Sequence, residues 1–192
     1  MAIRSEDSRR AVLEATMKLL DGSGSDGFTV QKLSIERIAR EAGVSKTTIY
    51  RWWSSKVAVV IDTFLDNHVA RTPVREDVPA IDALREHMAS LAEVYAGNEG
   101  RLVAQLIGEC QQDEATMVEF KEHFWLPRAV VVTSLVERAI DEGSMRKDLD
   151  AQTVTELLYA PIYFRLLFQS GPLDAKATGA IMQTALEGLA GA

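Results

Sequence analysis

Side chains that can bind a phosphate or read a base pair are concentrated in one short segment of this sequence. Lys46, Thr47, Tyr50 and Arg51 fall on one side of a helix, because successive residues turn by about 100°. Arginine can donate two parallel hydrogen bonds to guanine, a threonine methyl can contact thymine, and lysine and tyrosine can reach phosphates. The chemistry that these residue types support is recognition of double-stranded DNA.

The residues from 35 to 53 have the spacing of a helix-turn-helix. Ala39 is small where the two helices would cross, and Gly43 can supply the tight turn between them. In such a unit the second helix lies in the DNA major groove, with its N-terminal residues on the base edges. The apolar residues expected to fill the joint are Ile38, Ala42, Val44, Ile49 and either Trp52 or Trp53.

Serines at helix starts and one further lysine extend this candidate surface. Ser34 and Ser45 can cap the two helices, and Ser54 or Ser55 can cap the next one. The amides at a helix N-terminus suit a phosphate. The predicted DNA-binding residues are Ser34, Ser45, Lys46, Thr47, Thr48, Tyr50, Arg51 and Lys56.

The alternative interpretation of this segment is a plain helical hairpin with a glycine turn. Against it, the exposed side carries lysine, threonine, tyrosine and arginine, and no acidic residue occurs between Val44 and Ile61. This charge pattern favours a DNA-reading helix.

Helical periodicity dominates the whole chain and predicts an all-α fold. Apolar residues recur three and four positions apart, and alternating runs are scarce. Pro127 is expected to bend or interrupt one helix, and Pro161 lies inside another. The predicted helices cover residues 8–20, 34–43, 46–53, 56–69, 81–96, 101–112, 116–140, 150–169 and 175–189.

The charge of the chain differs between its two parts. The net charge of -7 over 192 residues argues, as an average, against a nucleic-acid binder. Residues 1–60 hold ten Lys/Arg and seven Asp/Glu, giving +3, so the remaining residues carry -10. The asymmetry predicts a helix-turn-helix DNA-binding domain of three helices at 1–57 and a helical domain for ligand binding and dimerisation at 58–192.

Several functional classes are disfavoured by composition. The single cysteine, Cys110, cannot form an internal disulfide, and the three histidines have no ligand partner at metal-binding spacing. No apolar run approaches the ~20 residues of a membrane span, and the N-terminus lacks a signal peptide. We therefore expect a cytoplasmic protein that is not an enzyme and needs no metal or cofactor.

The segment from Gly43 to Lys56, GVSKTTIYRWWSSK, resembles the signature of the tetracycline-repressor (TetR) family of bacterial transcriptional regulators. Thr48, Ile49, Tyr50, Trp53 and Lys56 match its pattern, and the resemblance extends over about residues 8–65. It implies a homodimeric repressor on a palindromic operator, released by an unknown small molecule bound in the C-terminal domain.

The resemblance also implies a dimer interface built by the last two helices and a ligand pocket inside the C-terminal domain. For both sets of residues the alternative is that they form the monomer's own core. The proposed interface positions are Leu158, Ile162, Leu166, Ile181, Ala185 and Leu189. The proposed pocket positions are Tyr95, Leu106, Cys110, Phe124, Trp125, Tyr159 and Tyr163.

A competing class is a helical ligand-binding or interaction protein that does not bind DNA. Salt-sensitive binding to an operator would distinguish the two classes.

Overall fold

The computed structural model describes residues 2–21 and 29–189, without the side chains of residues 2–5, 66–70 and 189. These residues contain helices and no strand, so the predicted all-α fold is confirmed. The elements are α1 (Ala2–Leu20), η1 (Val30–Lys32), α2 (Ile35–Ala42), α3 (Lys46–Tyr50), α4 (Lys56–Arg71), α5 (Ala80–Ala96), α6 (Asn98–Cys110), α7 (Glu114–Phe120), η2 (Lys121–Trp125), α8 (Leu126–Asp141), α9 (Ala151–Phe168) and α10 (Ala175–Leu189).

The chain divides into two compact units. The first consists of Met1–His68 with Leu102–Phe124, and the second of Val69–Arg101 with Trp125–Ala192. Most of α6, together with α7, therefore belongs with the N-terminal helices. The division does not follow a single cut of the chain, and the domain boundary after residue 57 stays a prediction.

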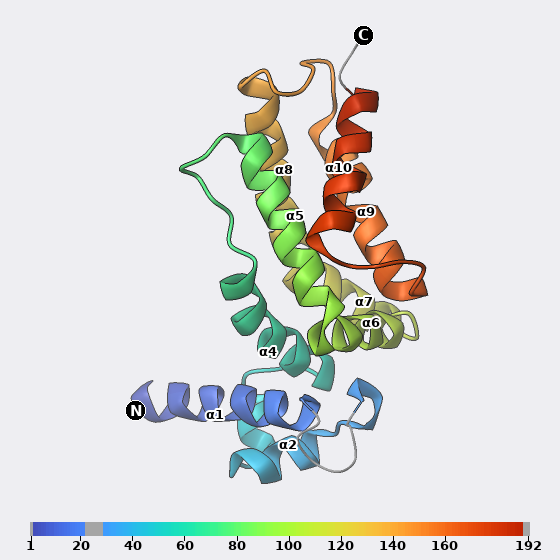
Figure 1. The fold of residues 1–192 in the computed structure, drawn as a ribbon. Helices are drawn as coiled ribbons and strands as arrows, with labels where there is room; N and C mark the ends of the chain where they lie inside the picture. The colour runs from blue at the N-terminus through green and yellow to red at the C-terminus, as the bar shows by residue number, and fades with distance from the viewer. Residues whose placement is uncertain (1, 22–28, 190–192) are drawn as a thin grey trace. The chain divides into compact units, whose positions relative to one another are not determined.

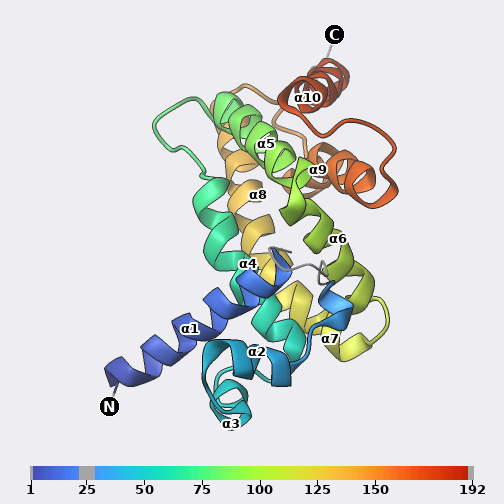
Figure 2. The same cartoon turned by 60° about the horizontal axis from the view of Figure 1, so that its bottom comes forward.

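The core of the first unit forms where α1 packs on α2 and α3 (Figure 2). Val12, Ile38, Ile49 and Phe64 are fully buried. Burying an aliphatic or aromatic side chain of this size stabilises a fold by about 1.5–3 kcal/mol. This packing holds the short helix α3 in a fixed orientation.

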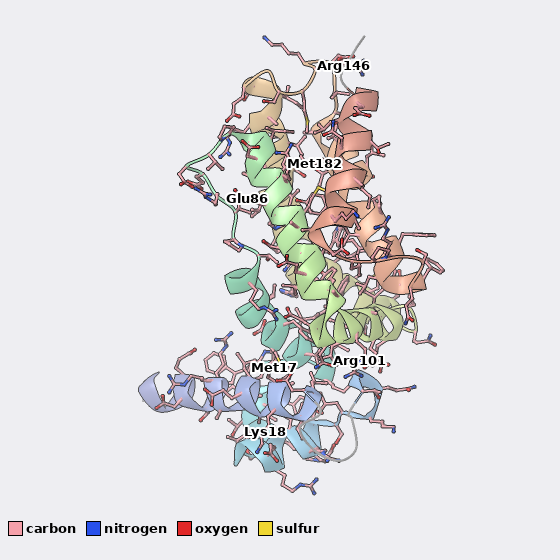
Figure 3. The ribbon with its side chains drawn as sticks, viewed as in Figure 1. Met17, Lys18, Glu86, Arg101, Arg146 and Met182 are labelled. Carbon is pink, nitrogen blue, oxygen red and sulfur yellow. The ribbon has the colours of Figure 1, made fainter. Side chains whose placement is uncertain are left out.

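The second unit is built around α5, which contacts α8, α9 and α10 (Figure 1). Leu84, Met88 and Leu158 are buried in its core. Met182 of α10 lies against α5 and is also buried (Figure 3). Arg146 lies in the connection from α8 to α9, away from this core (Figure 3). The antiparallel arrangement of α8 and α9 follows from this short connection.

Local signals predicted several helix ends correctly. The side chains of Ser34, Ser45 and Asp150 each accept a hydrogen bond from the amide three residues later and so cap α2, α3 and α9. These bonds satisfy amides that have no partner within the helix. The predicted helix at 175–189 has the observed bounds of α10.

Other boundaries differ from the prediction for tertiary reasons. The helix expected over 46–53 ends at Tyr50, because the amides of Trp52 and Trp53 both donate to the Ile49 carbonyl in a tightened last turn. The break predicted between residues 97 and 100 is confined to Gly97, since α5 ends at Ala96 and α6 begins at Asn98, so Gly100 is helical. Gly100 is buried against the Tyr95 carbonyl, and a Cβ atom there would clash with that oxygen.

The helix predicted over 116–140 is interrupted before Pro127. A π-helical turn, Lys121–Trp125, separates α7 from α8, and Pro127 lies in the first turn of α8. Proline fits that position because the amide it lacks would have no helical partner.

Candidate nucleic-acid interface and ligand cavity

The turn between α2 and α3 has a defined hydrogen-bond geometry. Gly43 has φ +67°, and its amide donates to the Arg40 carbonyl at 3.4 Å. The Val44 amide donates to the Ala39 carbonyl at 3.0 Å. This pair of bonds is a Schellman motif, which favours glycine at the left-handed position. The turn residue identified in the sequence thus sets the direction in which α3 begins.

A buried tryptophan anchors the end of α3. Trp53 is 4% exposed, whereas Trp52 is 40% exposed, so Trp53 is the residue that fills the joint. The Trp53 indole donates to Asp62 Oδ2 at 2.9 Å, and Arg9 donates to the same oxygen at 3.3 Å. One carboxylate of α4 therefore holds both α1 and the end of α3.

The side chains predicted to read DNA lie on the exposed side of this unit. Lys46, Thr47, Tyr50 and Arg51 are all exposed, and Thr48 is partly exposed. These base-reading candidates are therefore accessible to solvent.

An exposed ion pair lies at the edge of the same surface. Lys46 Nζ is 2.9 Å from Glu36 Oε1 of α2. This hydrogen bond lowers the pKa of Glu36 and raises the pKa of Lys46. Exposed pairs contribute little stability, so a phosphate can replace the carboxylate at low cost.

The N-terminus of α4 is held by glutamates that the sequence analysis did not identify. Ser54 Oγ and Ser55 Oγ donate to the two oxygens of Glu119 at 2.6 and 2.7 Å. Lys56 Nζ lies 3.2 Å from Glu109 Oε1. Ser55 also accepts from the Ala58 amide, which makes it the cap of α4. The predicted phosphate ligand Lys56 is thus already paired within its own unit.

No sequence signal links these partners, because more than fifty residues separate Lys56 from Glu109. Their meeting depends on the packing of α6 and α7 in the first unit. The Val30 amide similarly donates to Gln105 of α6 at 3.1 Å.

A cavity of about 590 Å³ lies in the second unit between α8 and α9, with α5 at its base. Its size is within the range typical of small-molecule sites, about 300–1,000 Å³. The lining residues are His87, Leu91, Trp125, Leu126, Arg128, Ala129, Val130, Val132, Thr133, Ser134, Glu137, Gln152, Thr155, Glu156, Tyr159, Ala160 and Tyr163.

Aromatic and hydroxyl groups gather at one end of this cavity. His87 Nδ1 and Tyr159 Oη are 2.7 Å apart, and the hydroxyls of Tyr95 and Tyr163 are 3.2 Å apart. Trp125 meets Tyr163 edge to face, with ring centroids 5.1 Å apart. These contacts define a polar cluster within mainly apolar walls.

Burial raises the pKa of all three tyrosines, Tyr95, Tyr159 and Tyr163. The guanidinium of Arg128 acts in the opposite direction on each of them. The positive charge of Arg128 therefore favours the ionised form of each tyrosine, against the larger effect of burial.

The structure places the predicted pocket residues in two separate groups. Trp125, Tyr159 and Tyr163 line the cavity, and Tyr95 contacts it through Tyr163. The remaining three, Leu106, Cys110 and Phe124, are buried in the first unit.

Cys110 is 1% exposed, and burial followed by the charges of Glu109 and Glu119 raises its pKa to about 11. A protonated, buried thiol of this kind is a weak nucleophile.

His87, Arg128 and Thr155 were not singled out by the sequence analysis, although they line the cavity. Arg128 directly follows Pro127 and comes three residues after Trp125. No local pattern in the sequence indicates that its side chain faces the space between α8 and α9. The described residues contain no group of three candidate metal ligands.

The positions predicted for the dimer interface divide by burial. Leu158, Ile162 and Leu166 are buried within the second unit of the monomer. Ile181 and Ala185 of α10 are partly exposed, and the side chain of Leu189 lies outside the described residues. A different stripe of α9 is exposed and apolar, formed by Leu157, Phe164, Leu167 and Phe168.

None of the described helices combines the length and the hydropathy that a membrane crossing requires.

Comparison with known proteins yields two family matches. Residues 12–63 match the family described as "Bacterial regulatory proteins, tetR family". Residues 80–185 match "Tetracyclin repressor-like, C-terminal domain". Together these matches include the helix-turn-helix and the helices around the cavity.

Two relatives are similar over nearly their whole length. The transcriptional regulator YdeS of Bacillus subtilis is 34% identical over 97% of this chain and 91% of its own. The DNA-binding transcriptional repressor TetR of Mycobacteroides abscessus is 29% identical over 97% of this chain and 95% of its own.

Two solved structures share the fold. The TetR family transcription regulator SCO0332 has a TM-score of 0.81 and 27% identity, over 96% of this chain and 100% of that one. The repressor FadR of Thermus thermophilus, solved with lauroyl-CoA, has a TM-score of 0.72 and 22% identity, over 96% of each chain.

Proposed function

Since this chain belongs to the TetR family of bacterial transcriptional regulators, we propose that it is a cytoplasmic repressor that leaves its palindromic operator when a small molecule fills the α8–α9 cavity. The observation that carries the proposal is the geometry of the helix-turn-helix. Ser45 caps α3 and buried Trp53 anchors its end, and this arrangement leaves four side chains exposed, Lys46, Thr47, Tyr50 and Arg51. No catalytic step is part of this function.

Four exposed residues of α3 and its C-terminal turn have proposed roles on DNA. Arg51 donates two hydrogen bonds to a guanine edge, and Thr47 contacts a thymine methyl. Tyr50 and Lys46 bind phosphates, which set the position of the helix without reading sequence. Ser34 supports the same surface, because its capping bond to the Arg37 amide orients the start of α2.

Binding to a palindrome requires two copies whose reading helices lie ~34–36 Å apart, one turn of DNA. We assign the dimer contact to the exposed stripe of α9, Leu157, Phe164, Leu167 and Phe168. The rings of Phe164 and Phe168 are tilted by 36° with centroids 4.9 Å apart, and the two side chains are 56% and 69% exposed. Apolar patches of this kind on a soluble protein mark interaction sites.

The dimer contact is tested by the double variant Phe164→Ser with Phe168→Ser. Sedimentation is expected to shift from dimer to monomer and operator affinity to fall. A variant that sediments as a dimer would place the contact elsewhere.

Release of DNA requires the ligand to bind the DNA-incompetent conformation more tightly than the competent one. The cavity supports this part of the proposal by its size and mixed lining. Further support comes from FadR of Thermus thermophilus, which shares the fold and was solved with lauroyl-CoA.

DNA binding is tested by selecting sequences from a pool of random duplexes, followed by titration at several salt concentrations. We expect enrichment of a palindrome, salt-sensitive affinity, and loss of binding in the double variant Tyr50→Ala with Arg51→Ala. Arg146→Ala, which removes one exposed arginine far along the chain, serves as the control. Failure to enrich any sequence would favour a helical ligand-binding protein without DNA activity.

A further inference from the structure

The cavity between α8 and α9 has two chemically different ends. Trp125 contacts Tyr163 at one end, while Thr133 and Thr155 lie 3.3 Å apart further along the antiparallel pair. Arg128 lines the cavity from α8, three residues or about one helical turn after Trp125, and so lies toward the aromatic end. Glu137 and Gln152 line the other end.

The charged groups at the two ends differ in exposure. Arg128 is partly buried and is the single arginine or lysine among the lining residues in the described part of the chain. Glu137 and Glu156 also line the cavity, but both are exposed. Because interactions strengthen as water is excluded, the arginine end contributes more to ligand binding than the solvated carboxylates.

An aromatic cluster by itself would suit a cation held against ring faces. In this cavity the partly buried guanidinium of Arg128, about one helical turn from Trp125, already places a positive charge toward the aromatic end. A second cation placed there would be repelled, whereas an anion would gain charge-assisted hydrogen bonds. The hydroxyls of Tyr159 and Tyr163 supply further polar groups at the same end.

The rest of the lining suits an apolar body. Leu91 and Val132 lie at the base of the cavity and are buried, and Trp125 forms part of its wall. Val130, 66% exposed, lies where the cavity opens. A ligand with its charged group at Arg128 can therefore bury its body along α8.

We propose that this cavity binds an organic monoanion, with a carboxylate at Arg128 and an aromatic or acyl body against Leu91, Val132 and Trp125. This inference rests on the proposed function, because it names the chemical class of the effector for the same cavity. Ligands that are neutral or cationic at this position bind less tightly.

The test uses the full-length protein and two matched series of probes, measured by calorimetry at pH 7.5. One series has a naphthalene body with a carboxylate, a hydroxymethyl or an aminomethyl group. The other has a ten-carbon chain with a carboxylate, a hydroxyl or an ammonium group. We expect the carboxylate to bind at least about 10-fold more tightly than its neutral counterpart in one or both series.

Variants locate this preference. Arg128→Gln is expected to remove it, and Arg128→Lys to retain part of it, because lysine keeps the charge without the planar fork. Arg85→Gln removes an exposed arginine of α5 that does not line the cavity, and it is expected to leave probe binding unchanged. Thermal unfolding of each variant confirms that it is folded.

The proposal is overturned if neutral or cationic probes bind as tightly as the carboxylate in both series, if no probe binds, or if folded Arg128→Gln keeps the preference. A separate titration of the operator complex distinguishes this inference from the proposed function. A carboxylate that binds at Arg128 without releasing DNA would contradict the proposed ligand-controlled repression but not the ligand class. Release of DNA by a cationic compound would contradict the ligand class but not the ligand-controlled repression.

Discussion

The DNA-reading surface and the ligand cavity are built in opposite ways. The reading surface uses neighbours in the chain, from Ser34 to Arg51, on two short helices with serine caps. The cavity collects side chains from His87 to Tyr163, on α5, η2, α8 and α9, whose relative positions depend on the core. The first site can therefore be recognised from a short sequence, whereas the second exists only after the helices pack.

The two sites also differ in how their polar groups are held. On the reading surface, the pair of Lys46 and Glu36 is exposed and easily exchanged for a phosphate. In the cavity, His87 and Tyr159 meet at 2.7 Å and are buried. Buried polar groups are costly to leave unpaired, so the cavity is expected to be the more rigid of the two.

Stability and DNA contact can be separated within α3 itself. Ile49→Ala removes a fully buried side chain and is expected to lower the free energy of unfolding by about 2–4 kcal/mol. Thr47→Ala, two residues away and exposed, is expected to change it by less than about 0.5 kcal/mol while weakening DNA binding. Urea unfolding and operator titration measure both effects. Equal destabilisation by the two variants would mean that the reading face is also core.

Sequence reading is predicted to depend on Arg51. Arg51→Ala is expected to cost about 1–3 kcal/mol of binding to the selected operator and to relax preference at a single base pair. The measurement is a titration against operators substituted at each position. A uniform loss across all operators would instead identify Arg51 as a phosphate ligand.

The pairing of Lys56 with Glu109 provides a smaller test of how α6 affects the reading surface. Glu109→Gln removes the charge 3.2 Å from Lys56 Nζ. A freed lysine that binds a phosphate is expected to raise operator affinity a few-fold and to steepen the salt dependence by about one counterion. Weaker DNA binding in this variant would show that Glu109 positions Lys56 for DNA.

The smallest predicted effect is that of alkaline pH on the free energy of unfolding. Burial raises the pKa of Cys110 from 9.0 to about 11, so the folded state keeps a proton that the unfolded state loses. Stability from this group is complete well below pH 9 and falls as the pH rises, by about 0.4 kcal/mol between pH 7 and 9. Unfolding of Cys110→Ala over this range should show a shallower pH dependence, and an unchanged slope would contradict the predicted burial effect.

Local sequence was sufficient to predict most helices of the fold and the turn that orients α3. Ser34, Gly43 and Ser45 act through bonds to residues no more than four positions away, and such bonds can be inferred from spacing. The same reasoning could not choose between Trp52 and Trp53. That choice depends on Asp62 of α4, which accepts the Trp53 indole.

Hydrophobic periodicity in the sequence could not predict which elements contact one another over a long range. Apolar stripes on α9 indicated that Leu158 and Ile162 face other helices, but a stripe is the same whether its partner is another helix or another subunit. The exposed stripe with Phe164 and Phe168 became visible only once the buried face of α9 was known.

The sequence by itself determined the all-α class, the helix-turn-helix and the residues on its exposed face, because these depend on bonds and periodicities within a few residues. Tertiary structure alone decided that Glu109 and Glu119 hold the start of α4 and that Arg128 shares a cavity with His87 and Tyr159. The physical reason is that burial and long-range electrostatic contacts depend on how helices pack, which local spacing does not specify.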